Sequence, residues 1–374
     1  MKQTFLSKTI TFFKKEIVLC LAAILSVISM FFVPPSAEYL EYMDWRVLAL
    51  LFGLMLVVGG LQSIGTFRYL GLRLLERTKS ARALSLLLVA LCFFSAMLIT
   101  NDVALLTFVP FAIMILNLAG QSRLLIPVIV LQTIAANLGS MLTPIGNPQN
   151  LYLYSTFSIP MGTFLLDMLP LTAISLVLLV ISIFLLPNAP ITVDLKEDVA
   201  APSRQKLLLY IALFLVAIAC VLHLISWPIM LGILLVAVFF IDRKLFKTVD
   251  YFLLLTFVCF FLFIGNMERI PAVSTLLQSF IEGRELLLGV LFSQGISNVP
   301  AAILLSGFTQ NVRPLLYGVN VGGLGTLIAS LASVISYRAY GNSDNARKGT
   351  YMKSFTIYNV VFLVILYIAA WLLQ

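Results

Sequence analysis

Long apolar runs separated by short polar segments make up most of this sequence. Most runs reach the roughly 20 residues that a helix needs to cross about 30 Å of hydrocarbon, so the pattern predicts membrane-spanning helices. Nothing between the runs is long enough to form a separate soluble domain. Uninterrupted spans are expected at about 17–33, 46–67, 163–186, 207–225, 227–242, 250–266 and 354–373.

One further apolar run, 124–158, contains residues that a membrane helix normally excludes. Pro and Gly open the helical hydrogen-bond ladder, and an opened backbone at membrane depth persists only when it is buried in protein or lines a wet cavity. The run therefore predicts a broken helix at a binding site, and 314–337 predicts a second one. The interrupting residues of the first run are Asn137, Gly139, Ser140, Thr143, Pro144, Gly146, Asn147, Pro148, Gln149 and Asn150.

Two more apolar stretches, 83–118 and 285–310, carry a polar break at their middle. The breaks read Thr100-Asn101-Asp102 and Ser297-Asn298. Each stretch is too long for one helix and too short for two comfortable crossings. Both are interpreted as re-entrant helical hairpins whose tips stop near the middle of the membrane.

Charge distribution predicts the orientation. With a cytoplasmic N-terminus and an outside C-terminus, all but four of the 24 Lys and Arg residues fall in cytoplasmic segments, as the positive-inside rule requires. The net charge of +8 therefore reflects topology, and no nucleic-acid partner is expected. With 61% hydrophobic residues and a mean hydropathy of +1.06, the chain is expected to be a multi-pass protein of the plasma (bacterial cytoplasmic) membrane. The cytoplasmic segments are 1–16, 68–82, 119–123, 187–206, 243–249 and 338–353.

The two halves of the chain resemble each other, and matching segments face opposite sides in this topology. We expect a first inverted repeat at 1–186, a cytoplasmic linker at 187–206, a connecting span at 207–225 and a second repeat at 226–374. The predicted fold is an all-α polytopic membrane protein with two inverted repeats, re-entrant hairpins and discontinuous transmembrane helices, which is typical of secondary transporters. The matching segments are Asp44-Trp-Arg with Asp250-Tyr-Phe, Gly59-Gly-Leu-Gln62 with Gly265-Asn-Met-Glu268, Ile99-Thr-Asn101 with Ile296-Ser-Asn298, and Leu138-Gly-Ser140 with Leu324-Gly-Thr326.

Asp102 is the candidate for ion coupling. A carboxylate at membrane depth is costly unless it is paired, metal-bound or protonated, so it points to function. Thr100 and Asn101 offer neutral oxygens beside it, which suits Na⁺, whereas the carboxylate alone can carry H⁺. The alternative interpretation is that Asp102 only caps the returning helix of the hairpin. The remaining residues of the predicted coupling-ion site are Gly139, Ser297, Asn298 and Gly325.

A small anionic substrate must be recognised without Arg or Lys, because the layout leaves none near the midplane. The N-termini of half-helices at the hairpin tips and broken helices can bind an anion through free N–H groups and the positive end of the helix dipole. For Asn147-Pro148 an ordinary helix kink is the alternative. The predicted substrate site consists of Asn101, Ser140, Thr143, Gly146, Asn147, Pro148, Asn150, Ser297, Asn298 and Thr326.

Motifs for other activities are absent from the sequence. It contains no His-Glu-x-x-His zinc motif, no Gly-x-Ser-x-Gly elbow and no Gly-x-x-x-x-Gly-Lys-Ser/Thr phosphate loop, so we expect neither an enzyme nor an ATP-driven pump and no cofactor. The leading interpretation is a carrier that uses a Na⁺ or H⁺ gradient. A Na⁺/H⁺ antiporter using Asp102, a passive channel and an intramembrane enzyme are the alternatives.

Three segments resemble the ion transporter superfamily, which includes divalent-anion:sodium symporters and arsenite-permease-like proteins. They are Ile99 to Pro110, Asn137 to Asn150, and Ile296-Ser-Asn-Val-Pro-Ala301. The resemblance implies that the hairpins and broken helices form a moving domain that carries a small anion by an elevator motion, and that the protein forms a homodimer. The sequences at the two hairpin tips differ from the Ser-Asn-Thr motif that the dicarboxylate branch carries at both tips, and they favour the arsenite-permease-like branch. Efflux of arsenite or an oxyanion is therefore a further alternative.

Overall fold

The computed structural model describes residues 16–75, 78–191, 201–343 and 346–374. This part of the chain is helical, and its β-structure is one isolated bridge between Ser80 and Pro190. Eight of its helices are long and apolar enough to cross a membrane. They are α3 (Trp45–Ser63), α5 (Ala81–Ile99), α6 (Asn101–Leu118), α7 (Leu125–Ser140) with the turn before it, α9 (Met161–Phe184), α10 (Arg204–Val221), α12 (Tyr251–Glu268) and α18 (Lys348–Leu372).

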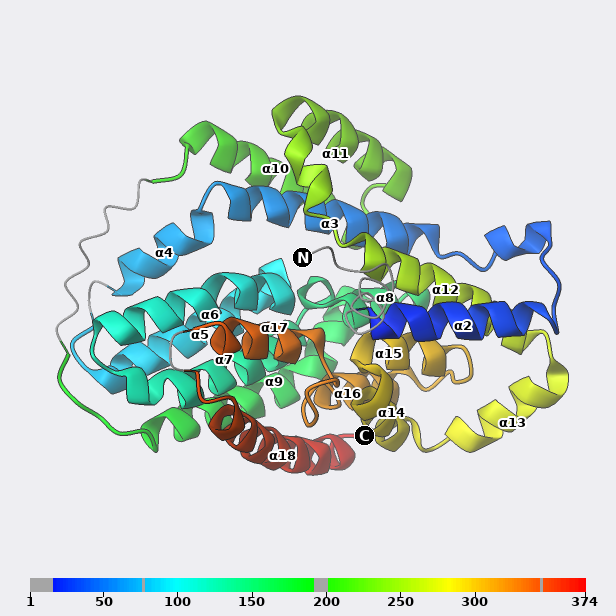
Figure 1. Cartoon of the computed structure of the whole chain (residues 1–374). Helices are drawn as coiled ribbons and strands as arrows, with labels where there is room; N and C mark the ends of the chain where they lie inside the picture. Colours follow the sequence, from blue (N-terminus) through cyan, green and yellow to red (C-terminus); the bar gives the residue numbers. More distant parts are fainter. Residues whose placement is uncertain (1–15, 76–77, 192–200, 344–345) are drawn as a thin grey trace, which may run out of the picture.

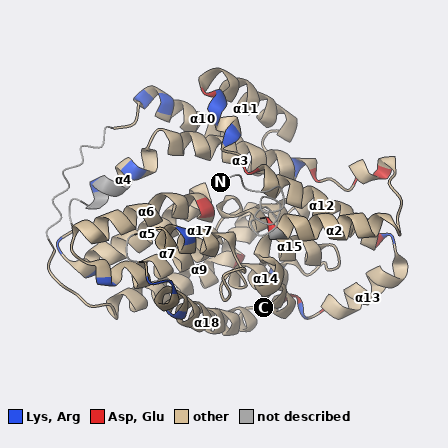
Figure 2. Ribbon diagram, viewed as in Figure 1, with Lys and Arg blue, Asp and Glu red and all other residues tan. Residues whose placement is uncertain are grey.

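The shorter helices complete the architecture shown in Figure 1. Figure 2 shows that charged residues gather mostly at helix ends and in connecting segments, as expected for a chain whose helices lie in lipid. The shorter helices are α2 (Ile17–Met30), α4 (Thr66–Leu75), α8 (Pro148–Thr156), α11 (Trp227–Ile241), α13 (Pro271–Ile281), α14 (Glu285–Ile296), α15 (Asn298–Ser306), α16 (Val312–Val321) and α17 (Leu331–Gly341).

Each expected uninterrupted span coincides with one helix, namely α2, α3, α9, α10, α11, α12 and α18. The structure adds α4 and α13, which lie in segments expected to be loops. Both are short, with 10 and 11 residues, so they lack the length on which the recognition of a span depends. Helices α5 and α6 are also longer than expected for hairpin arms, because each is long enough to cross a membrane.

The segment expected to be a solvated linker begins with ordered contacts. The backbone N–H of Ala81 donates to the carbonyl of Ala189 at 2.8 Å, and the N–H of Ile191 donates to Lys79 at 3.2 Å. The chain that leaves α9 is therefore attached to the start of α5. The rest of the expected linker, 192–200, and the basic residues before position 16 lie outside the described residues.

Extensive packing joins the helices of a large bundle, and outside it α2 packs on α12 while α10 and α11 pack on α3 (Figure 1). These two smaller sets meet where α3 contacts α12. We call α2, α3, α10, α11 and α12 the frame, and α5 to α9 with α14 to α18 the central bundle. The strongest contacts between frame and bundle are those of α3 with α8 and of α12 with α15. Helix α4 joins frame to bundle in the first half, and α13 does so in the second.

Helices α3 and α12 run antiparallel and contact each other's ends reciprocally. A Cβ placed on Gly59, near the end of α3, would lie 2.7 Å from Oγ1 of Thr248, just before α12. A Cβ on Gly265, near the end of α12, would lie 2.4 Å from the ring of Tyr42, just before α3. The same pair of contacts thus occurs twice with the roles of the helices exchanged.

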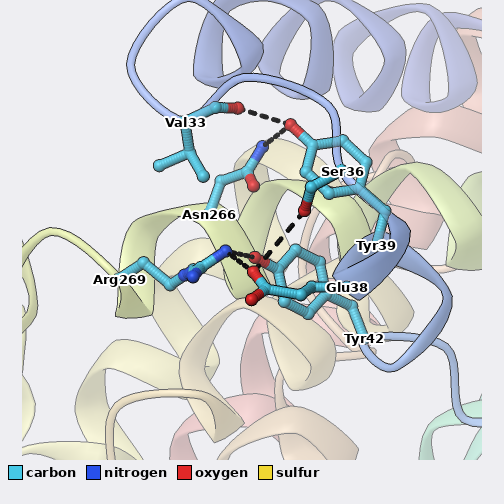
Figure 3. A network of polar contacts seen from close by, with 7 residues as sticks. All are labelled: Val33, Ser36, Glu38, Tyr39, Tyr42, Asn266 and Arg269. Carbon is cyan, nitrogen blue, oxygen red and sulfur yellow. Dashed lines mark hydrogen bonds and ion pairs between the residues drawn. The ribbon is translucent and has the colours of Figure 1, made fainter.

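Polar contacts also attach the segment between α2 and α3 to the end of α12 (Figure 3). Buried Asn266 donates to the hydroxyl of Tyr39 at 3.0 Å, and Arg269 pairs with Glu38 and donates to Tyr42 at 3.3 Å. The Arg269–Glu38 pair is exposed, whereas Asn266 is buried, so the buried amide is the part of this network that joins α12 to the segment after α2.

Candidate functional site

Two residues with the same unusual backbone geometry separate the paired helices. Thr100, between α5 and α6, has φ 72° and ψ 149°, and Ser297, between α14 and α15, has φ 76° and ψ 153°. A positive φ is uncommon for residues other than Gly and often marks a functional site. The side chain of neither residue caps the helix that follows, so both helix N-termini lack side-chain capping.

The two broken helices are interrupted where the sequence predicts. Helix α7 ends at Ser140 and α8 begins at Pro148, with a short 3₁₀ turn (Pro144–Gly146) between them. Helix α16 ends at Val321 and α17 begins at Leu331. The expected segments 124–158 and 314–337 therefore match the observed breaks.

A small cavity lies where the tips and breaks meet. Its volume is about 10 Å³, roughly the space that one buried water requires. The first residues of α6, α8, α15 and α17 all contribute to its wall, so four helix N-termini converge on one point. The lining residues are Asn101, Asp102, Pro148, Gln149, Leu253, Ser297, Asn298, Val299, Ser330 and Leu331.

Asp102 contributes the one carboxylate of this wall, and no Lys or Arg is among the lining residues. Its Oδ1 atom is buried and has no hydrogen-bond partner among the described residues. The cap position of α6 is occupied by Thr100, and the N–H of Asp102 is bonded at 2.9 Å to Oδ1 of Asn101. The structure therefore does not show Asp102 as the cap of the returning helix.

Asn137 links the two halves beside the cavity. Its Oδ1 accepts hydrogen bonds from Asn101 at 3.1 Å and Ser330 at 2.9 Å, and its Nδ2 donates to the carbonyl of Gly323 at 3.4 Å. These partners belong to the first tip and to the second broken helix. Because buried polar groups must be satisfied, this amide fixes the relative position of the two elements.

A second amide network lies behind the wall. Asn147 caps α8 by accepting from the N–H of Asn150 at 2.9 Å, and its Nδ2 donates to Ser140 at 3.0 Å and to Asn320 at 3.3 Å. Asn320 in turn donates to Oδ1 of Asn150 at 2.7 Å. These side chains hold the first broken helix against α16.

Gln294 performs a similar role in the second half. Its Nε2 donates to the carbonyls of Gly322 at 2.9 Å and Leu324 at 3.0 Å, and its Oε1 accepts from the N–H of Thr326 at 2.8 Å. One side chain thus satisfies three backbone groups of the opened segment. Gly325, with φ 103°, lets the segment approach so closely that a Cβ would lie 2.3 Å from Oε1 of Gln294.

The structure divides the predicted site residues into two sets. Asn101, Asp102, Pro148, Ser297 and Asn298 line the cavity, and Thr100 forms the first tip next to it. The other set supports the wall and is not part of it, and Thr326 is exposed. This second set comprises Gly139, Ser140, Thr143, Gly146, Asn147, Asn150, Gly325 and Thr326.

Several residues of the site were missed from the sequence. Gln294 and Asn320 are polar residues inside apolar stretches, a signal that was present but was not used. Ser330 was overlooked because its position beside Asn137 depends on packing between the halves. Val299 was overlooked because an apolar side chain next to the second tip gives no chemical signal of a site. Among the described residues, no cluster of His, Cys, Asp and Glu could hold a metal ion.

Known proteins share this sequence over most of its length. A family described as citrate transporters matches residues 8–314. An uncharacterized transporter of Methanocaldococcus jannaschii is 31% identical over 331 residues, covering 88% of this chain and 90% of its own length. The inner membrane protein YbiR of Escherichia coli is 32% identical over 323 residues, covering 82% and 83%.

A silicon efflux transporter of rice (Oryza sativa subsp. japonica) is 34% identical over 151 residues, which is 40% of this chain and 30% of that protein. The family match includes both hairpin tips and the whole first broken helix, and thus every lining residue of the cavity except Ser330 and Leu331. The resemblance inferred from the motifs is thereby confirmed, and this chain belongs to the citrate transporter family of membrane transporters.

Proposed function

We propose that this protein is a secondary active transporter that moves a small anion across the cytoplasmic membrane, driven by a gradient of Na⁺ or H⁺. The observation that carries the proposal is the cavity at which four helix N-termini meet one unpartnered carboxylate. Helix N-termini favour an anion and a carboxylate favours a cation, so we propose that the two ligands bind side by side in a state in which the cavity is wider than the space for one water that it has here.

Electrostatics makes the binding of the two ligands interdependent. At about 4 Å and an effective dielectric constant of about 20, two unit charges interact by roughly 4 kcal/mol. An anion in this cavity is repelled by the free carboxylate of Asp102, and a cation or proton on the carboxylate removes that repulsion. Binding of the cation therefore raises the affinity for the anion, which is the thermodynamic basis of symport.

The wall of the cavity suits an anion without a cationic side chain. Asn101 and Asn298 stand at the start of two helices whose N-cap residues make no side-chain cap bond, so the positive ends of both helix dipoles point to the cavity. The N–H of Asp102 and the N–H of Asn298 are themselves bonded, to Oδ1 of Asn101 and to the carbonyl of Ala329. Pro148 and Leu331 start the other two helices. These two helices are capped by the side chains of Asn147 and Ser330, so they contribute their dipoles and not free N–H groups. We assign the substrate to the positive ends of these four helices and the coupling ion to Asp102.

The two-group architecture supports an elevator motion. The most extensive helix contacts lie within the bundle and, in the frame, between α2 and α12 and between α3 and its neighbours α10 and α11, whereas the contacts of α3 and α12 with the bundle are smaller. The cavity lies mainly in the bundle. Leu253 of α12 is the frame residue in the wall. In this proposal the bundle slides along the frame and carries the cavity from one side to the other, with α4 and α13 as the connections.

Two inverted repeats give this motion its symmetry. The order of long helix, short connecting helix, helix pair, broken helix and long helix occurs from α3 to α9 and again from α12 to α18. The reciprocal contacts of antiparallel α3 and α12 support an inversion between the repeats. We also propose a cytoplasmic N-terminus and hairpins that end within the membrane.

A second candidate is efflux of a small oxyanion or hydroxylated acid such as arsenite. The relative named as a silicon efflux transporter favours it, as does a cavity wall of amides and hydroxyls without a cation. Exchange of Na⁺ for H⁺ on Asp102, without an anion, is the remaining alternative. Flux measurements separate these three functions.

The test is uptake into proteoliposomes with imposed gradients. Labelled carboxylates, oxyanions and arsenite are offered under a Na⁺ gradient, a pH gradient or neither, and internal pH is recorded. We expect gradient-driven accumulation of one anion class, which is lost in Asp102→Asn. Asp44→Asn is the matched control, because Asn also caps helices and position 44 is outside the cavity.

Accumulation by Asp102→Asn equal to that of the wild type would exclude the proposed coupling role. Movement of protons against Na⁺ without transport of any anion would establish the antiporter instead. Export of arsenite or an oxyanion against its gradient would favour the efflux function.

A further inference from the structure

The two hairpin tips place corresponding residues in the wall of the cavity. Thr100 and Ser297 have backbone angles that agree within 4°, and an Asn follows each of them at the first position of a helix. The next residues, Asp102 and Val299, therefore occupy equivalent positions. All four residues that follow the tips line the cavity.

The chemistry at these equivalent positions differs. Asp102 brings an ionisable oxygen into the cavity, and Val299 brings two methyl groups. The backbone angles at the two tips match and an Asn follows each tip, although the two asparagines have different hydrogen-bond partners. The difference in charge is confined to the side chains of Asp102 and Val299. A cation site built on a carboxylate can therefore form on the wall of the first tip and has no counterpart on the second.

The other oxygens near Asp102 are largely engaged. The Oδ1 of Asn101 accepts the N–H of Asp102 at 2.9 Å, and Ser330 donates its hydroxyl to Asn137 while accepting the N–H of Ala332 at 3.2 Å. Only Oδ1 of Asp102 is both buried and without a partner among the described side chains of the wall. An unpartnered buried carboxylate oxygen indicates a ligand of opposite charge.

We infer that this transporter binds one monovalent cation per cycle, on the carboxylate of Asp102, and that the equivalent position at Val299 is the reason that no second cation binds. The inference rests on the proposed function and specifies its stoichiometry. The cation is Na⁺ or H⁺, since either neutralises one carboxylate. Transport of a monovalent anion is then electroneutral.

The experiment measures the dependence of anion uptake on cation concentration in proteoliposomes. One series varies Na⁺ at fixed pH, and another varies pH without Na⁺, so the series that drives uptake identifies the cation. For the wild type we expect a Hill coefficient of 1 in that series and no effect of membrane potential on the uptake of a monovalent anion.

Moving the carboxylate provides the decisive comparison. Val299→Asp should raise the Hill coefficient from 1 towards 2. Val299→Asn introduces a side chain of the same size as Asp without its charge, and it should leave the Hill coefficient at 1. Asp102→Val should abolish cation dependence, and Asp102→Val combined with Val299→Asp should restore it with a Hill coefficient of 1. Thermal unfolding and gel filtration verify that each variant is folded.

A Hill coefficient near 2 in the wild type would overturn the inference, as would a folded Val299→Asp variant that remains at 1 or a double variant without cation dependence. Failure of the proposed function is distinguishable from these results. If no anion is transported at all, cation binding to the detergent-solubilised wild type and variants is titrated by thermal stabilisation. One saturable site that disappears in Asp102→Val then supports the inference, and two sites refute it.

Discussion

Removing the Asn147 side chain tests whether the amide network behind the cavity determines the position of α8. Asn147 is 1% exposed, caps α8 and donates to Ser140 and Asn320. Asn147→Ala removes the cap, which contributes about 1 kcal/mol in typical helices. It also leaves Oδ1 of Asn320 without this donor in a buried position, at about 1–3 kcal/mol. We therefore expect Asn147→Ala to lower the free energy of unfolding by about 2–4 kcal/mol in total.

Asn147→Ser separates the two contributions. Ser is as good a cap as Asn but is too short to span the distance to Asn320. Asn147→Ser should lower the free energy of unfolding by about 1–3 kcal/mol. This decrease is smaller than that for Asn147→Ala by roughly the cap contribution of 1 kcal/mol. Both variants should also bind the transported anion more weakly, because Pro148 and Gln149 at the start of α8 line the cavity.

The assay is unfolding in mixed micelles by titration with a denaturing detergent, followed by circular dichroism. Asn117→Ala is the control, because Asn117 is exposed at the end of α6 and should shift the midpoint little. Wild-type stability in Asn147→Ala would show that the network does not support the broken helix. Equal losses for Ala and Ser would refute the assignment of the cap.

Two backbone predictions use the same unfolding assay. Thr100→Gly and Ser297→Gly should each leave the free energy of unfolding unchanged or raise it by up to about 1 kcal/mol, because Gly adopts a positive φ without strain. A decrease of more than about 1 kcal/mol would show that the side chains at these positions matter more than the backbone strain. Gly325→Ala should destabilise by about 1–3 kcal/mol, since φ is 103° and the new Cβ would lie 2.3 Å from Oε1 of Gln294; unchanged stability would contradict the close approach described for this segment.

Much of the helix layout could be predicted from the sequence because it depends on local signals. Asp44 and Asp250 cap α3 and α12 with their side chains, and the apolar runs that follow set the lengths of these helices. The breaks at Thr100 and Ser297 were visible because polar residues interrupt long apolar runs. Helices α4 and α13 escaped notice because short helices lack a strong periodic signal.

The site could be predicted only in part. Asn101 and Asn298 were placed correctly at the cavity, since they stand at the predicted tips. Asn147 was expected to bind substrate, but its amide is directed to Asn320 of the other half, 173 residues away in sequence. No local rule indicates whether a buried amide faces a ligand or another amide.

The sequence by itself determined that this chain is a helical membrane protein, where its helices break, and that one carboxylate stands at a break. These properties follow from hydrocarbon thickness, backbone hydrogen bonding and the cost of charge in lipid, which act on each segment separately. The tertiary structure decided that the breaks share one cavity, that Asp102 and Val299 both line it, and which amides line the wall or support it. Those facts depend on contacts between distant segments, and the energies of such contacts are settled only when the helices pack.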